Sequence, residues 1–173
     1  MRVLGIDPGY AICGYGLLDA NGHQAAAVAF GALTTPAHTR FEDRLNEVYN
    51  DVRQLLADFA PDVMAIETLF FNSNQKTAVA VAEARGVILL AAHQAGVPIY
   101  EYSPLQVKNS IVGYGKAIKH QVQEMTRRLL KLREAPKPDD AADALAIALC
   151  HAHSAHSRQF GRSKTRREEM GYL

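Results

Sequence analysis

Four acidic residues from three separate parts of the sequence could act together in catalysis. Asp7 and Glu67 each end a short apolar segment, RVLGID and DVMAIE. Asp140 and Asp143 are three residues apart in DDAADALAIAL, so on a helix their Cβ atoms would be about 5–6 Å apart on one face. A set made only of carboxylates suits hard divalent cations such as Mg²⁺ or Mn²⁺.

Most of these acids also have a purely structural interpretation. Asp7 precedes Pro8-Gly9, a turn in which an Asp side chain commonly accepts backbone hydrogen bonds. Glu67 could be a surface acid at a strand end, and for Asp139 we favour a role at the N-terminus of a helix. Asp143 is harder to explain in this way, because it lies among alanines at the start of a segment that is apolar nearly all round.

The charge of four neighbouring carboxylates must be compensated. Two carboxylates about 5 Å apart repel by roughly 3 kcal/mol at an effective dielectric constant near 20, and uncompensated acids take up protons. A basic residue from elsewhere in the chain could supply the compensation. Alternatively, two cations about 4 Å apart would do so, and such a pair can stabilise both the attacking and the leaving oxygen of a phosphodiester displacement. The pattern therefore favours Asp7 as a metal ligand.

The segments around the acids predict an α/β fold with a mixed five-stranded sheet flanked by helices. RVLGID, CGYGLLDA and HQAAAVAFGAL read as an antiparallel meander, with turns at Pro8-Gly9 and Asn21-Gly22. DVMAIE and PIYEY read as strands reached through helices, which implies parallel pairing. Ligands of open sheets gather at the carboxyl ends of the strands, where Asp7 and Glu67 are expected.

Helical spacing and capping signals predict five helices. The first should begin at Thr39, which forms a capping-box pattern with Glu42, and should stop before Pro61. The second should run from about Asn74 to Ala95, and the third from Ser103-Pro104 to near Gly113. A fourth helix lies in KAIKHQVQEMTRRLLKL and a fifth in DDAADALAIALCHA. The fourth should bury one apolar face, made of Ile118, Val122, Met125, Leu129 and Leu132.

Length and composition indicate one domain in the cytoplasm. The chain has 173 residues, enough to bury a core, and we assign 1–153 to the domain and 154–173 to a basic, flexible tail. No apolar run is long enough for a membrane span, and the first residues lack the features of a signal peptide. Cys13 and Cys150 lie in apolar surroundings and are expected to be reduced, buried thiols.

The net charge of +1 conceals two halves of opposite sign. Residues 1–104 carry 6 Lys and Arg against 11 Asp and Glu, whereas residues 105–173 carry 13 against 7. This asymmetry suits a protein that binds cations in one place and a polyanion in another. Chance scatter of surface charge would explain it equally well.

Several motifs together resemble the RuvC family of Holliday-junction resolvases over residues 2–153. They are GIDPG followed by GYG, AIE with an aromatic residue three positions later, EARGV, QVK and DAADALAIA. The resemblance implies an RNase H-like fold, a homodimer, Mg²⁺-dependent nicking of two strands of a four-way DNA junction, and a branch-migration partner. It also implies that Asp7, Glu67, Asp140 and Asp143 are the catalytic acids. Some members have His at one of the last two positions, and Tyr10 stands where the family often has a small hydroxyl residue.

The same resemblance implies three DNA-contacting residues. Phe70 matches a family position whose ring enters the junction and stacks on a base, an interaction worth on the order of 1–3 kcal/mol. Lys108 and Lys119 match basic positions near the scissile phosphate. Without the resemblance, both lysines would read as solvated helix residues. Phe71, next to Phe70, reads as a core or helix-capping residue.

Two further segments have open interpretations. TAVAVAEARGVILLAAH is rich in Ala and Gly, which suits either the core of the monomer or a two-fold dimer contact. His151, His153 and His156 form HAHSAH, whose spacing is poor for a zinc site. His151 lies eight residues after Asp143, roughly on the same helical face, where it could support that acid.

Two other functions remain as alternatives. Actin-like or sugar-kinase-like ATPases also begin with a strand, an Asp and a glycine-bearing hairpin, but they need a second domain that 173 residues do not provide. A catalytically inactive or RNA-processing relative of the same fold is the other alternative, and the complete set of four acids argues against it.

Overall fold

The computed structural model describes residues 1–22, 24–69 and 75–158. In chain order the elements are β1 (Arg2–Asp7), β2 (Ile12–Asn21), β3 (Gln24–Thr34), α1 (Phe41–Phe59), β4 (Val63–Glu67), α2 (Gln75–Gln94), β5 (Ile99–Tyr102), α3 (Pro104–Val112), α4 (Lys119–Leu129) and α5 (Asp139–Arg158). Among these described residues, no helix is long and apolar enough to cross a membrane.

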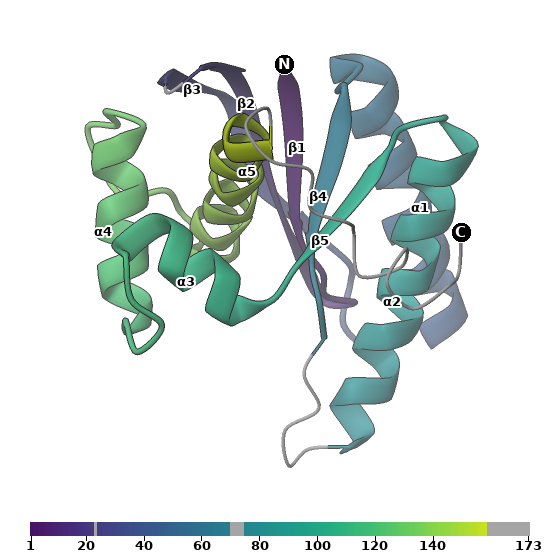
Figure 1. Cartoon of the computed structure of the whole chain (residues 1–173). Coiled ribbons are helices and arrows are strands. Elements are labelled where there is room, and N and C mark those ends of the chain that lie inside the picture. Colours follow the sequence, from purple (N-terminus) through teal and green to yellow (C-terminus); the bar gives the residue numbers. More distant parts are fainter. Residues whose placement is uncertain (23, 70–74, 159–173) are drawn as a thin grey trace.

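The five strands form one mixed sheet in the order β3-β2-β1-β4-β5 (Figure 1). β1, β2 and β3 pair antiparallel, whereas β4 pairs parallel with both β1 and β5. The predicted meander and parallel strands are therefore confirmed. Because β1 and β4 are parallel neighbours, they end at the same edge of the sheet.

Helices cover both faces of the sheet (Figure 1). Side chains of a strand alternate between the two faces, and the core divides accordingly. Leu4, Ile6, Met64 and Ile66 pack with α1 and α2 on one face. The intervening positions of β1 and β4 face α5, with α3 and α4 beside it. Both cysteines are buried thiols, as expected.

The third helix begins and ends as its sequence predicts. Ser103 caps α3 by accepting a hydrogen bond from the Gln106 amide (3.2 Å), and the Gln106 side chain accepts one from the Ser103 amide (2.8 Å). Gly113 ends the helix with a φ of 90°, a conformation that glycine adopts without steric cost.

The capping box predicted at Thr39 does not form. Helix α1 begins at Phe41, and its N-cap position is Arg40. The Thr39 hydroxyl donates instead to the carbonyl of Pro36 (2.9 Å), within the turn that precedes the helix. The sequence pattern matched the motif, but a local turn satisfies the hydroxyl first.

The fourth and fifth helices differ from expectation at their ends. Helix α4 begins after Ile118, which is 64% exposed, and its last residue Leu129 is 39% exposed. Only Val122 of the predicted apolar face is fully buried, while Met125 and Leu132 pack at the edge of the core. Helix α5 continues to Arg158, beyond Ala152, the last residue of the predicted helix DDAADALAIALCHA; residues 159–173 lie outside the described part of the chain.

Candidate active site

Asp7 and Glu67 lie side by side at the carboxyl edge of the sheet. In the register of β1 and β4, Ile6 pairs with Ile66, so the acids that follow them are neighbours. Asp7 is two residues beyond Gly5, and Glu67 is two residues beyond Ala65. Both therefore point to the face that α5 covers.

Glycines in the strands allow α5 to lie almost in contact with the sheet. A Cβ atom at Gly5 would be 2.1 Å from the carbonyl oxygen of Ala144, and one at Gly14 would be 2.1 Å from that of Asp140. No larger residue fits at either position. Gly14 pairs with Asp7 across β1 and β2, so this close approach brings the first turn of α5 next to the β1 acid.

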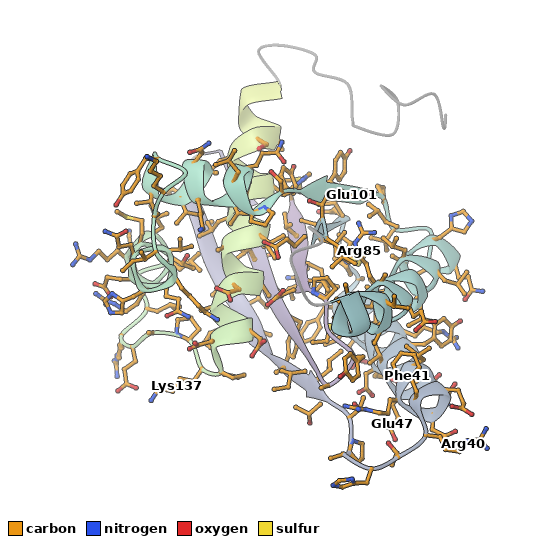
Figure 2. The ribbon with its side chains drawn as sticks, turned by 90° about the horizontal axis from the view of Figure 1, so that it is seen from below. Arg40, Phe41, Glu47, Arg85, Glu101 and Lys137 are labelled. Carbon is orange, nitrogen blue, oxygen red and sulfur yellow. The ribbon has the colours of Figure 1, made fainter. Side chains whose placement is uncertain are left out.

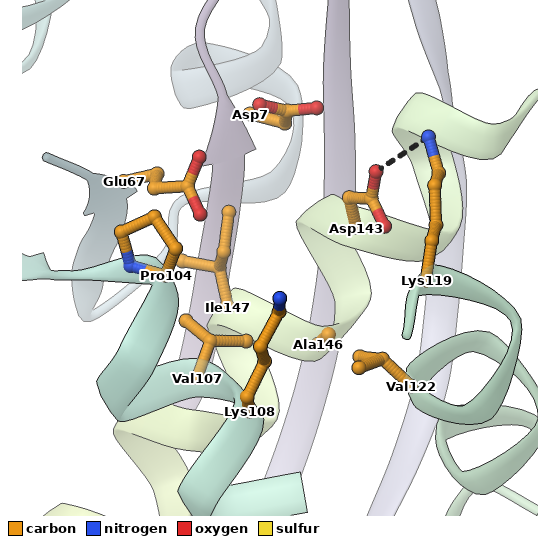
Figure 3. A pocket seen from close by; sticks show the side chains of 10 residues that line it. All are labelled: Asp7, Glu67, Pro104, Val107, Lys108, Lys119, Val122, Asp143, Ala146 and Ile147. Atoms are coloured by element: carbon orange, nitrogen blue, oxygen red, sulfur yellow. Dashed lines mark ion pairs between the residues drawn. The ribbon is translucent and has the colours of Figure 1, made fainter. Parts of the chain in front are cut away.

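An open pocket lies between these acids and α3 (Figure 3). Asp7, Glu67 and Asp143 line it together with Lys108 and Lys119. The rest of the wall is apolar and consists of Pro104, Val107, Val122, Ala146 and Ile147. The structure thus brings the predicted acids of β1, β4 and α5 together with both predicted lysines. Asp140 is not among the residues that line the pocket, although its charge acts on Asp7.

Burial and mutual repulsion make the strand acids hard to ionise. Burial raises the pKa of Asp7 to about 7, and the negative charges of Glu67, Asp143 and Asp140 add to the rise. Burial likewise raises the pKa of Glu67 to about 7, with a further contribution from Asp143 and a smaller opposing one from Lys108. A site that holds carboxylates in this way favours a ligand that brings positive charge.

Asp143 forms an ion pair with a lysine. The ammonium group of Lys119 lies 3.1 Å from Asp143 and 3.4 Å from Asp139 (Figure 3 shows the first pair). Burial raises the pKa of Asp143, and Lys119 offsets part of that rise. Burial lowers the pKa of Lys119, but its bonds to Asp143 and Asp139 outweigh this, so the pKa of Lys119 is raised. Asp139 therefore contributes to an ion pair as well as to the first turn of α5.

The donor set fits divalent cations that keep part of their hydration. In the described part of the chain, Asp7 and Glu67 form no ion pair. Within the same residues, no three acidic, His or Cys side chains are close enough together to hold one ion by themselves. Mg²⁺ typically takes one or two carboxylates and completes its shell with water and substrate phosphate. An open pocket with carboxylates on facing walls meets that requirement.

The turn after Asp7 is fastened to the start of α1. The Thr35 hydroxyl donates to the carbonyl of Tyr10 (2.7 Å), and Arg44 donates to that hydroxyl (2.8 Å). The Tyr10 ring packs edge-on against Phe41, and the Arg44 guanidinium lies 4.7 Å from the ring centre. Tyr10, the departure from the family pattern, thus has a packing role on the side away from the pocket lining.

Other predicted residues are placed differently or not at all. His151 is buried on α5, and its Nδ1 lies 2.9 Å from the Tyr102 hydroxyl, so it contacts β5 and does not line the pocket. His153 Nδ1 lies 3.1 Å from the Ser110 hydroxyl. Phe70, the predicted base-stacking residue, and the neighbouring Phe71 lie outside the described residues.

Arg85 belongs to the EARGV motif, and the sequence alone predicted no role for it. The structure places it behind Glu67, where its Nε donates to the Glu67 carbonyl (3.1 Å) and its Nη2 to Glu101 (2.6 Å). The available signal was Arg85 in the run AVAVAEARGVILLAA, in which Glu83 is the one other charged residue. A charged side chain in such a run needs a partner.

Comparisons with known proteins agree on one family. The family profile described as "RuvC: Crossover junction endodeoxyribonuclease RuvC" matches residues 3–151. The "Crossover junction endodeoxyribonuclease RuvC" of Heliobacterium modesticaldum is 56% identical over 154 residues, covering 89% of this chain and 95% of the relative. That of Desulfitobacterium hafniense is 53% identical over 156 residues, covering 90% and 94%.

Solved structures give the same result. The Thermus thermophilus RuvC structure superposes with a TM-score of 0.85 at 38% identity, covering 91% of this chain and 97% of that one. A second structure, T. thermophilus RuvC in complex with a Holliday junction substrate, gives 0.84 at 36% identity and covers 95% and 99%. The RNase H-like fold expected from the sequence is confirmed.

Proposed function

Because the chain belongs to the RuvC family of crossover junction endodeoxyribonucleases, we propose that it resolves four-way DNA junctions by paired, symmetric nicks. The observation that carries the proposal is the pocket edge where Asp7 and Glu67 are neighbours with pKa values of about 7. We assign Asp7, Glu67, Asp140 and Asp143 as the acids that hold the catalytic cations. The relative solved with a Holliday junction supports the choice of substrate.

The acids present suit Mg²⁺, with Mn²⁺ as a substitute and two ions for each active site. Bound cations of this kind activate the attacking water and neutralise the leaving oxygen. The chain's own contribution is to hold the carboxylates on three rigid elements, so that little reorganisation accompanies the reaction. The rest of the pocket wall is apolar.

Two lysines are the candidates for contact with the DNA phosphate. Lys119, on α4, and Lys108, on α3, line the same pocket as the acids. We propose that they contact the DNA backbone beside the scissile bond and offset the charge that develops on the phosphate. For Phe70, in the segment after β4, we propose stacking on an unpaired base of the junction.

Two matched cuts need two active sites, and a two-fold dimer supplies them. Helix α2 carries Val79 and Leu90, which are 58% and 48% exposed. We propose that this face of α2 packs against its copy in a second chain. We also propose action on chromosomal junctions in the cytoplasm during recombination and repair, with a branch-migration machine as partner.

A gel assay with a synthetic four-way junction tests the proposal. In the presence of Mg²⁺ the protein should nick two opposite strands at matching positions, and EDTA should abolish nicking while the protein still shifts the junction. An inactive or RNA-processing relative would bind without cutting DNA in any divalent cation. An ATPase would bind ATP in calorimetry and would neither bind nor nick the junction.

A further inference from the structure

The guanidinium group of Arg85 joins α2 to two neighbouring strands. Its Nε donates to the backbone carbonyl of Glu67 (3.1 Å), and its Nη2 donates to the carboxylate of Glu101 (2.6 Å). The side chains of Arg85 and Glu101 are only 14% and 20% exposed. Figure 2 shows the two labelled residues next to each other.

The Glu67 carbonyl lies where the sheet stops providing hydrogen-bond partners. Successive residues of β4 bond to its two neighbours in turn, and the Thr68 amide donates to the Tyr102 carbonyl of β5 (2.8 Å), so the backbone groups of Glu67 face β1. The pairing of β4 with β1 ends at Ile66 and Ile6, and Pro8, two residues further along that chain, has no amide to donate. A side chain from α2 therefore takes the place of a further rung of the ladder.

The contact holds the backbone of Glu67 from the face of the sheet opposite to its carboxylate. Ile66, the preceding residue, packs with α1 and α2, whereas the Glu67 side chain faces α5. Arg85 reaches the sheet from α2. The Glu101 side chain lies on the same face of the sheet, because the next residue of β5, Tyr102, belongs to the core on the opposite face. Because the guanidinium is planar, its two bonds hold one geometry between the strand end and the helix.

We propose that Arg85, held by Glu101, is a positioning residue that fixes the carboxyl end of β4 and thereby orients the Glu67 carboxylate for divalent cations. The inference rests on the proposed function of Glu67 as a cation ligand. It also gives a reason for a lone arginine in the small and apolar helix α2. If that helix forms the dimer contact, Arg85 is the link that ties Glu67 to the same element.

The test compares Arg85→Met, Arg85→Lys and Glu101→Gln with Arg53→Met, a control on the exposed face of α1. Two quantities are measured: the Mn²⁺ concentration that half-saturates the thermal stabilisation of the protein without DNA, and the Mg²⁺ concentration that half-saturates nicking. For Arg85→Met we expect both to rise by about tenfold, with junction affinity within about twofold of the wild type. Arg85→Lys keeps one of the two hydrogen bonds, so its half-saturating Mn²⁺ and Mg²⁺ concentrations should lie between those of Arg85→Met and the wild type.

Glu101→Gln guards against a variant that fails to fold, since it keeps the shape and one acceptor but removes the charge. We expect it to change the half-saturating Mn²⁺ in the same direction as Arg85→Met, and by less. Unchanged cation affinity in both variants would overturn the inference, as would a loss of stability without a change in cation affinity. Glu67→Gln separates the two proposals: if it nicks normally, the proposed function of Glu67 fails; if it is inactive while Arg85→Met binds Mn²⁺ normally, only the role of Arg85 fails.

Discussion

The ammonium group of Lys119 lies 3.1 Å from the carboxylate of Asp143, although the two residues come from different helices. This ion pair offsets the charge of one acid, whereas burial raises the pKa values of two others, Asp7 and Glu67, to about 7. Among the described residues, the pocket therefore has one side whose acid forms an ion pair and another whose acids form none. That division decides what substitutions of Lys119 and Asp7 should do.

Replacing Lys119 should slow the chemistry more than it weakens binding. In Lys119→Met we expect nicking at saturating Mg²⁺ to fall about a hundredfold, because a charge beside the reacting phosphate is lost. Junction affinity should fall only a few-fold, since one phosphate contact among many is removed. Lys116→Met, three residues earlier and also exposed, is the matched control. Equal nicking rates for the two variants would exclude Lys119 from the reaction.

A methyl group at Gly14 should separate α5 from the sheet. Gly14→Ala would place a Cβ 2.1 Å from the Asp140 carbonyl oxygen, and relieving that overlap must move helix backbone. We expect a loss of at least about 3 kcal/mol in the free energy of unfolding and loss of nicking in the protein that still folds. Urea unfolding and the junction assay measure both. Wild-type activity in Gly14→Ala would show that close packing of α5 is not needed to place its acids.

The pH dependence of stability follows from the raised pKa values of Asp7 and Glu67. Unfolded carboxyls titrate near pH 4, so between about pH 4 and pH 7 the folded protein binds more protons than the unfolded chain. These two groups should therefore lower the stability of the metal-free protein as the pH rises through that range. A cation competes with those protons, so stabilisation by Mg²⁺ should be larger at about pH 8 than at about pH 6.

Thermal unfolding with and without Mg²⁺ at both pH values measures this effect. Asp7→Asn removes one of the groups and should raise the melting temperature of the metal-free protein at about pH 8 by several degrees. The same variant should lose most of the stabilisation by Mg²⁺. A stabilisation by Mg²⁺ that is independent of pH would contradict the assignment of Asp7 and Glu67 as the cation-binding acids.

The α2 face should control assembly. Leu90→Glu places a charge on the exposed apolar surface of α2, and we expect it to convert a dimer to a monomer in analytical ultracentrifugation. The monomer should nick junctions singly, without the paired cuts. Val28→Glu is the matched control, because Val28 is 44% exposed on the edge strand β3. A stable dimer of Leu90→Glu would mean that the contact lies elsewhere.

Local signals made much of the fold predictable. The apolar strands, the turns and the Ser103 cap of α3 depend on neighbouring residues, and all of them form as expected. Thr39 shows the limit of such signals, because its hydroxyl had a competing partner in Pro36. The strand acids could be placed together because parallel strands end at one edge of the sheet.

Contacts between distant residues could not be predicted from the sequence. The pairing of Lys119 with Asp143 and that of Arg85 with Glu67 and Glu101 depend on how helices pack on the sheet. No local pattern specifies those contacts. Of the two forms of charge compensation that the sequence left open, a base from elsewhere in the chain is the one found at Asp143.

The most direct test of the cation-binding pocket is junction cleavage by Asp7→Asn, measured beside junction binding by the same protein. Asn keeps the size of the side chain and removes its charge, and Asp58→Asn on the exposed face of α1 serves as the control. We predict that Asp7→Asn binds the four-way junction with unchanged affinity and leaves every strand uncut at any Mg²⁺ concentration. Cleavage by Asp7→Asn at the rate of Asp58→Asn would contradict the account.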